Sequence, residues 1–197
     1  MTTSAPSKNT RDAILDAAQY FVQNDSYDGF SFRDVAQTVG IRKASIYHHF
    51  ESKEGMAVAM LERGREHLRL WARHHASLSP QERLRGYCFD LYRDQLGAGN
   101  SLCPAGAFVG GWSHMPDAMC RAALGVMHEQ ALFLSTAMAD GCADGSLRLP
   151  PGCDNKEAAI WFATTVQGAL IVSRAHGGSA QFTQLCETTI ATLSVRD

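Results

Sequence analysis

A short segment in the first quarter of the chain carries side chains that can read DNA base pairs. Arg42 and Lys43 follow Gly40, and behind them the apolar residues Ile46 and Phe50 recur at helical spacing. Arg and Lys side chains can donate to guanine O6 and N7 in the major groove. Because these cations stand at the start of a helix whose other face is apolar, they are candidates for direct base readout.

The residues just before this segment predict the helix that must hold it. Ser31-Phe32-Arg33-Asp34 has the form of a capping box, in which a hydroxyl and a carboxylate satisfy free backbone donors at a helix start. Gly40 suits the positive φ that often ends a helix. Two short helices, Ser31 to Gly40 and Ala44 to Phe50, joined by a tight glycine-containing turn, are typical of a helix-turn-helix.

The segment from Gly29 to Glu54 strongly resembles the DNA-binding signature of TetR/AcrR-type regulators. The resemblance is most specific in Ile46-Tyr47-His48-His49-Phe50 and the Ser52-Lys53-Glu54 that follows. It implies an N-terminal arm and three-helix DNA-binding domain in residues 1–53, and a six-helix ligand-binding and dimerisation domain in residues 54–197. The DNA-contacting residues that follow, from the resemblance and from the physics of recognition helices, are Ser31, Arg33, Arg42, Lys43, Ala44, Ser45, Tyr47, His48 and Lys53.

Within this set the resemblance assigns phosphate contacts to Ser31, Tyr47 and Lys53, which position the domain rather than specify sequence. Some alternatives stay open. Tyr47 could be a core aromatic residue, and Arg33 could belong to a solvated face. Of the two adjacent histidines, one is expected to face DNA and the other to pack or be solvated, and we favour His48 for DNA.

Apolar periodicity predicts helices throughout the remaining chain, so the expected fold is all-α, with about nine helices and no strand. Beyond the N-terminal helix from Thr10 to Asn24 and the helix-turn-helix, the expected helices span about 52–78, 80–97, 116–141, 155–176 and 180–193, and a flexible arm precedes them at 1–9. The glycine-rich stretch from Leu102 to Trp112 is expected to be irregular.

The family resemblance places a homodimer interface on the last two helices. Small residues would allow close approach and larger ones would supply apolar area: Ala159, Ala163, Gly168 and Ala169, with Phe162, Val166 and Leu170. A monomer could also bury part of this surface internally. A two-fold dimer would set its two recognition helices about 34–36 Å apart, as a pseudo-palindromic operator requires.

A small-molecule effector is expected to bind within the larger domain. The predicted contacts are Cys103, Phe108, Trp112, Trp161 and Gln167, with Tyr87, Leu91 and Met115 as further lining candidates. The segment from Leu102 to Phe108 resembles the cysteine-containing segment of a TetR subgroup, some of whose members sense reactive electrophiles. Cys103 is therefore either a sensor, whose thiolate fraction a helix N-terminus would raise, or a buried inert thiol. Cys120 is a weaker candidate as its resolving partner.

Composition limits the other function classes. The 197 residues are 45% hydrophobic, with net charge −2 and six cysteines but no Cys-x-x-Cys pair, which indicates a cytoplasmic protein with reduced thiols. No apolar run reaches membrane-spanning length. No nucleophile elbow, phosphate loop or paired-carboxylate arrangement indicates an enzyme, and neither a cofactor nor a metal is expected, the His114, Cys120 and His128 set being poorly spaced. A pure interaction scaffold remains the rival class, and it would leave Lys43 and Tyr47 dispensable.

Overall fold

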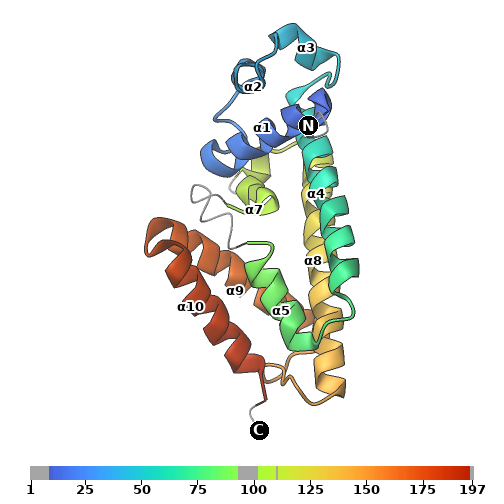
Figure 1. The fold of residues 1–197 in the computed structure, drawn as a ribbon. Coiled ribbons are helices and arrows are strands. Elements are labelled where there is room, and N and C mark those ends of the chain that lie inside the picture. The colour runs from blue at the N-terminus through green and yellow to red at the C-terminus, as the bar shows by residue number, and fades with distance from the viewer. Residues whose placement is uncertain (1–8, 93–101, 110, 196–197) are drawn as a thin grey trace, which may run out of the picture.

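The computed structural model describes residues 9–92, 102–109 and 111–195, and these are helical almost throughout (Figure 1). Three helices form one end of the molecule: α1 (Thr10–Asp25), α2 (Phe32–Val39) and α3 (Lys43–Tyr47). The predicted all-α class is confirmed, with nine α-helices in the described residues. The recognition helix predicted over Ala44 to Phe50 is shorter than expected. It ends at Tyr47, and residues 48–50 lead into the next helix.

Two long helices run side by side along the length of the molecule, α4 (Lys53–His75) and α8 (Asp117–Ala143) (Figure 1). The Glu129 carboxylate of α8 joins them, since Arg65 Nη2 and Arg69 Nη2 of α4 lie 2.9 and 2.6 Å from its Oε1 atom. Helix α4 thus belongs to both parts of the protein, because its first turns pack against α1 and its later turns against α8.

The middle of the chain differs most from expectation. The helix that begins at Pro80, α5 (Pro80–Phe89), ends well before the predicted Gly97, and its predicted end lies outside the described residues. The stretch from Leu102 to Trp112, expected to be irregular, contains the short helix α7 (Pro104–Val109) and a 3-10 turn, η1 (Trp112–His114). Proline at the first helical position explains the start of α7, because its missing N–H would have no partner there in any case.

The last two helices, α9 (Asn155–Ala175) and α10 (Gly178–Leu193), pack against each other and against α8 and α5 (Figure 1). The structure corrects five of the seven residues predicted for a dimer interface, whereas Ala163 is half-buried and Gly168 is exposed. Ala159, Phe162, Val166, Ala169 and Leu170 are buried inside the subunit, so they supply core packing. The exposed apolar side chains of α9 are instead those of Ile160, Ile171 and Val172.

One continuous core connects the two ends of the molecule. It extends from Ile14 and Leu15 in α1 through Met60 in α4 to Phe162 in α9. The described residues contain no β-strand, only an isolated bridge between Leu147 and Ser194. None of the helices in this part of the chain combines the length and apolarity that crossing a bilayer would need.

Candidate DNA interface and effector cavity

Local hydrogen bonds fix the two ends of α2, as the sequence predicts. The Ser31 Oγ atom accepts from the Arg33 N–H at 3.2 Å, while the Ser31 N–H donates to the Asp34 carboxylate at 2.7 Å. The Ser31 hydroxyl also donates to the Asp34 carboxylate at 2.7 Å, and this bond together with that from the Ser31 N–H holds the pKa of Asp34 below its ordinary value. At the other end Gly40 has φ of +77°, and its N–H donates to the Ala36 carbonyl at 3.0 Å. Both ends of α2 are therefore defined, which fixes the turn into α3.

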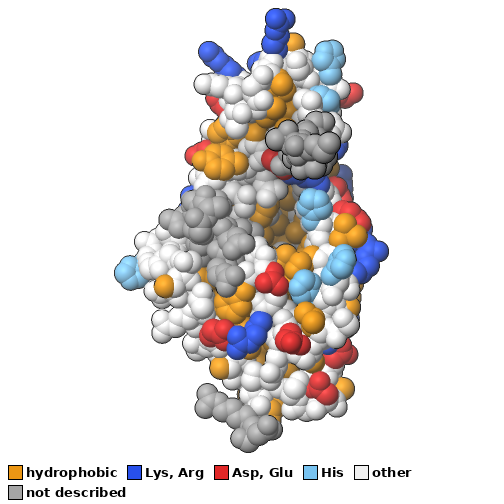
Figure 2. Space-filling view, viewed as in Figure 1, with side chains coloured by type: hydrophobic (Ala, Val, Ile, Leu, Met, Phe, Trp, Pro, Cys, Tyr) orange, Lys and Arg blue, Asp and Glu red, His pale blue; other side chains and the backbone are white. Residues whose placement is uncertain are grey.

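Helix α3 is anchored by a single buried side chain and exposes most of the others. Ile46 is fully buried, whereas Arg42, Lys43 and Ala44 are exposed and Ser45 is half-buried. Figure 2 shows Lys and Arg side chains projecting from this end of the molecule. The geometry brings these predicted base-reading residues together on one surface.

Tyr47 and the two histidines also lie on the surface. The Tyr47 ring is 52% exposed, and its edge packs against Phe32 of α2 with ring centroids 5.2 Å apart. Tyr47 is thus held in place by one contact and is not a core aromatic residue. His48 and His49 are both exposed. Ser31 and Arg33, at the start of α2, are exposed as well.

Lys53, at the start of α4, has its charged end engaged within the protein. Its Nζ atom donates to the Phe30 carbonyl at 2.5 Å and lies 4.5 Å from the centre of the Tyr27 ring. It also lies 4.3 Å from the Phe30 ring centre. Burial lowers the pKa of Lys53. These contacts link the loop between α1 and α2 to α4, a role that sequence reasoning missed.

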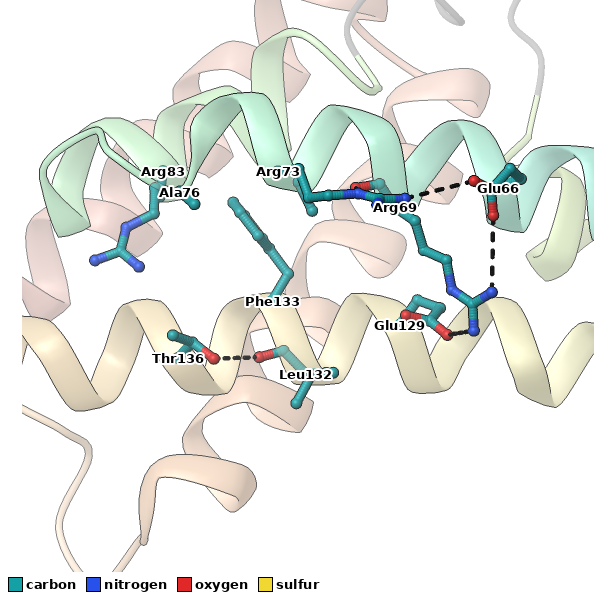
Figure 3. A pocket seen from close by; sticks show the side chains of 10 residues that line it. Glu66, Arg69, Arg73, Ala76, Arg83, Glu129, Leu132, Phe133 and Thr136 are labelled. Atoms are coloured by element: carbon teal, nitrogen blue, oxygen red, sulfur yellow. Dashed lines mark hydrogen bonds and ion pairs between the residues drawn. The ribbon is translucent and has the colours of Figure 1, made fainter.

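Three hollows, formed mainly by the helices that follow α3, are candidate ligand sites, and charged side chains line one of them. A groove of about 530 Å³ lies between α4, α5 and α8 (Figure 3). It contains the charged side chains of Glu66, Arg69, Arg73, Arg83 and Glu129. Arg83 is 6% exposed and pairs with Asp140 at 2.7 Å. None of the residues predicted to bind an effector lines this groove.

The other two hollows are adjacent chambers that share Cys103, Ala105 and Gln130 in their walls. The inner chamber, of about 390 Å³, lies between α1, α4, α7 and α8 and includes Gln19 of α1. The outer chamber, of about 340 Å³, lies between α7, α8 and α9 and includes Gln167. Of the predicted effector contacts, the structure therefore brings Cys103 and Gln167 together.

The remaining predicted effector residues are placed elsewhere. Phe108 is buried and lines a different hollow with Tyr27 and Met115. Trp112 is 36% exposed in η1, and Trp161 is half-buried on α9; neither lines any of these hollows. The two tryptophans predicted as effector contacts therefore do not converge on a common hollow.

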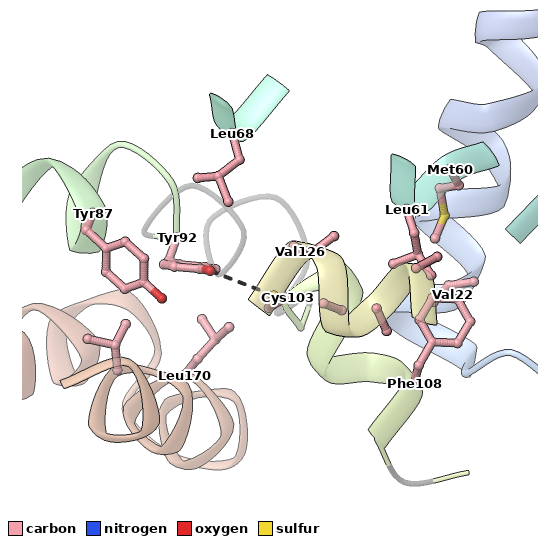
Figure 4. Close-up of a cluster of buried hydrophobic side chains, with 14 of the residues drawn as sticks. Val22, Met60, Leu61, Leu68, Tyr87, Tyr92, Cys103, Phe108, Val126 and Leu170 are labelled. Atoms are coloured by element: carbon pink, nitrogen blue, oxygen red, sulfur yellow. Dashed lines mark hydrogen bonds between the residues drawn. The ribbon is translucent and has the colours of Figure 1, made fainter. Parts of the chain in front are cut away.

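Polar groups meet at the wall between the chambers, where Figure 4 shows the Tyr92 hydroxyl beside Cys103. The Gln130 side-chain amide donates to the Tyr92 hydroxyl, and the Cys103 Sγ atom lies 3.8 Å from the same hydroxyl. Burial keeps the pKa of Tyr92 well above its ordinary value, so the hydroxyl stays protonated. Sequence reasoning missed Gln130, although a glutamine among the apolar residues of α8 was a visible signal.

Contacts from α9 and α7, two of the helices around the chambers, reach the DNA-binding end through the C-terminal part of α1. Arg174 of α9 donates to the carbonyls of Gln23 and Asn24, both at 3.2 Å. From α7, the Phe108 ring packs against the Tyr27 ring with centroids 5.9 Å apart. Because Tyr27 also contacts Lys53, the chain of contacts continues into the start of α4.

In the described residues, no three His, Cys, Asp or Glu side chains are grouped to hold a metal ion. The sequence leaves Cys120 open as a metal ligand or as a resolving cysteine. Its thiol points toward the Met115 carbonyl at 3.9 Å. Neither role is supported by a contact of this side chain.

Comparison with known proteins shows which family this chain resembles. Residues 14–60 match the model for bacterial regulatory proteins of the tetR family. The HTH-type transcriptional repressor ComR of Escherichia coli K12 is 27% identical over 190 residues, which cover 91% of this chain and 87% of ComR. The DNA-binding segment therefore matches the tetR family, and the chain resembles HTH-type and TetR-family transcriptional regulators over most of its length.

Two further similar proteins point to the same family. A TetR-family regulator from Agrobacterium tumefaciens superposes with a TM-score of 0.87 at 25% identity, over 94% of this chain and 98% of that one. IcaR of Staphylococcus aureus, a negative regulator of the biofilm operon icaADBC, is 41% identical over 46 residues, only 25% of its length. Family and fold point to a DNA-binding regulator rather than an enzyme. The assignment to a cysteine-sensing subgroup stays a prediction.

Proposed function

We propose that this chain is a repressor that binds a pseudo-palindromic operator as a homodimer and is released from it by a small-molecule effector. The observation that carries the proposal is the arrangement of α3. Arg42, Lys43 and Ala44 are exposed at its start, and Ile46 fixes its opposite face in the core. Residues 1–53 would form the DNA-binding domain, and residues 54–197 the domain that binds effector and dimerises.

Phosphate contacts would come from residues around this helix. Ser31 and Arg33 are exposed where the free N–H groups of α2 favour an anion. Tyr47 and His48 are exposed at the other end of α3. We assign Lys53 mainly to holding Tyr27 and Phe30 in place, because its ammonium group already has these partners. Its charge would still strengthen the field that attracts phosphate.

Dimerisation would use the exposed faces of α9 and α10. Ile160 and Ile171 of α9 are 58% and 59% exposed. On α10 the exposed residues Thr188 and Thr192 donate their hydroxyls to carbonyls of their own helix, so their methyl groups are available for packing. An apolar face of this kind on a regulator that must span two half-sites supports a two-fold interface.

Effector release would act through the joint between the chambers and α1. An effector shifts a conformational equilibrium only by its difference in affinity for the two states. A ligand in the inner chamber would contact Gln19 of α1 as well as α4, α7 and α8. Its affinity would therefore depend on the relative positions of these four helices. A coupling of about 1–3 kcal/mol would lower operator affinity several-fold to about a hundredfold.

Cys103 offers a second, covalent mode of sensing. It lines both chambers but is only 3% exposed, so a reagent would have to enter a chamber to reach its thiol. Modification there would displace Tyr92, whose hydroxyl lies 3.8 Å from the Cys103 Sγ atom and accepts a hydrogen bond from Gln130.

The test is an operator-binding titration on DNA upstream of the chain's own gene, with and without a small thiol-reactive probe. Wild type is compared with Cys103→Ser, and with Cys142→Ser as a control, because Cys142 is an exposed cysteine away from the chambers. Operator binding by all three proteins supports the repressor proposal, and its absence in folded wild type contradicts it. Loss of binding on modification in wild type and Cys142→Ser, but not in Cys103→Ser, would establish Cys103 as the sensor.

A further inference from the structure

The two chambers beside Cys103 differ from the rest of the surface in their lack of charge. Among the described residues, neither chamber is lined by Asp, Glu, Lys or Arg, and the one basic side chain in their walls is that of His67 in the inner chamber. The outer chamber is formed mainly by apolar side chains: Met127, Ala131, Ile160, Ala163 and Ile171. Burying an ionised group without a partner costs several kcal/mol. The hydration free energy that a charged ligand loses here would therefore exceed the free energy that it gains from the walls.

Neutral polar groups are nevertheless present, and they are concentrated at the wall between the chambers. Gln130 is 7% exposed, and its amide donates to the Tyr92 hydroxyl. On the α9 side the Gln167 Oε1 atom lies against Gly106, where a Cβ would be only 3.2 Å away. Amides and a hydroxyl can exchange their present hydrogen bonds for bonds to a ligand carbonyl or hydroxyl, at little net cost.

The charged groove between α4, α5 and α8 provides the contrast (Figure 3). Arg69, Arg73 and Arg83 line it together with Glu66, Glu129 and the apolar side chain of Phe133. Its three cations outnumber its two carboxylates, so it suits an organic anion better than the chambers do. However, it is lined by no residue of α1 or α7. An anion bound there would lack the contact with α1 that the inner chamber offers through Gln19.

We propose that the effector of this regulator is an uncharged, largely apolar molecule with a carbonyl or hydroxyl group, bound in the chambers on either side of Gln130. The ligand's polar group exchanges hydrogen bonds with Gln130 or Tyr92, and its apolar body fills one or both chambers. Concave, mainly apolar sites with a few placed polar groups are the usual form of small-molecule pockets. This inference rests on the proposed function, of which it names the ligand class.

The experiment compares ligands of one shape and three charges by calorimetry at about pH 7, where a carboxylic acid is ionised. The probes are methyl 3-phenylpropanoate, 3-phenylpropanoate and 3-phenylpropylammonium, with methyl octanoate and octanoate as a second pair. The ester should bind wild type at least about tenfold more tightly than either ion. Ion binding equal to or tighter than ester binding, or no binding of either ester, would overturn the proposal.

Two variants assign the site, with thermal unfolding as the check that each is folded. Gln167→Lys places a cation at the outer chamber and should raise affinity for 3-phenylpropanoate about tenfold or more while weakening ester binding. Arg73→Ser, in the charged groove, should leave ester binding unchanged and remove any weak carboxylate binding. Ester binding that falls in Arg73→Ser and persists in Gln167→Lys would place the ligand in the groove and contradict the proposal.

These outcomes are independent of operator binding. A folded protein that binds the esters selectively but does not bind operator DNA would contradict the proposed function and leave the assigned ligand class of the chambers intact. A protein that binds operator DNA but prefers the ions would support the proposed function and contradict this inference.

Discussion

The side-chain amide of Gln23 donates a 2.6 Å hydrogen bond to the backbone carbonyl of Leu102, the residue directly before Cys103. Gln23 lies near the end of α1, whereas Leu102 leads into α7, and 79 positions separate them. The bond joins α1 to the residue directly before Cys103, which lines both chambers. Through it, a displacement of Cys103 would be transmitted to α1.

Replacing Gln23 should weaken this joint. Gln23→Leu removes the amide donor and leaves the Leu102 carbonyl without this hydrogen bond. The free energy of unfolding should fall by about 1–2 kcal/mol. Urea denaturation measures the change. Gln37→Leu, an exposed glutamine on α2, is the matched control and should stay close to wild type. Equal stability of the two variants would contradict a structural role for the bond.

Lys43 should determine base preference. Lys43→Ala removes an exposed cation at the start of α3, so we expect affinity to fall most for the preferred base and sequence discrimination to relax by about 1–3 kcal/mol. A panel of single-base operator variants measures this loss. Lys156→Ala, which removes an exposed lysine on α9, is the control for charge alone. Loss of affinity by the same factor on every sequence would contradict base readout by Lys43.

Lys53→Ala should act differently, because its ammonium group is held by Phe30 and Tyr27. We expect a loss of about 1–2 kcal/mol in stability from the lost hydrogen bond and cation–π contacts. Operator affinity should also fall by a similar factor on all sequences, with a salt slope reduced by about one unit or less. Unchanged thermal stability would show that these contacts are not formed in solution.

Glu129 gives the fold an acid-sensitive link between its two long helices. Hydrogen bonds from Arg69 and Arg65 lower the pKa of Glu129 in the folded state. Its contribution is therefore fully present above the ordinary glutamate pKa and is lost as pH falls through the lowered folded-state value. Unfolding measured from neutral to acid pH should show a steeper loss of stability in wild type than in Glu129→Gln. Parallel curves would contradict this assignment.

Gly168 allows the dimer interface to be tested without disturbing the subunit. It is exposed on α9, and a Cβ built there meets nothing within 4 Å. Gly168→Arg should therefore fold normally but place a bulky charge in the interface, shifting the protein toward monomer in sedimentation equilibrium. Thr136→Arg, on the exposed face of α8, should stay dimeric. A Gly168→Arg dimer as tight as wild type would exclude this face.

The sequence predicted what depends on neighbouring residues. The Ser31 capping box and the Gly40 helix end are local, and both are found where the pattern indicated. The family signature is equally local, since it lies in one contiguous segment.

Features that depend on residues far apart could not be predicted in this way. Periodicity shows that Phe162 and Val166 are buried, but not whether the partner or their own subunit buries them. Similarly, no local pattern shows that Lys53 turns toward Tyr27 or that Gln130 meets Tyr92. A glycine- and proline-rich composition also concealed α7, whose residues are held by contacts with α1, α4 and α8.

The central claim is that α3 reads DNA in each subunit of a dimer. Hydroxyl-radical footprinting of the upstream region tests it most directly, with wild type and Lys43→Ala compared at equal protein concentration. We predict that wild type protects two symmetrical half-sites about one helical turn apart or a multiple of it, and that Lys43→Ala protects them weakly or not at all. Absence of protection by folded wild type, or identical footprints from both proteins, would contradict the claim.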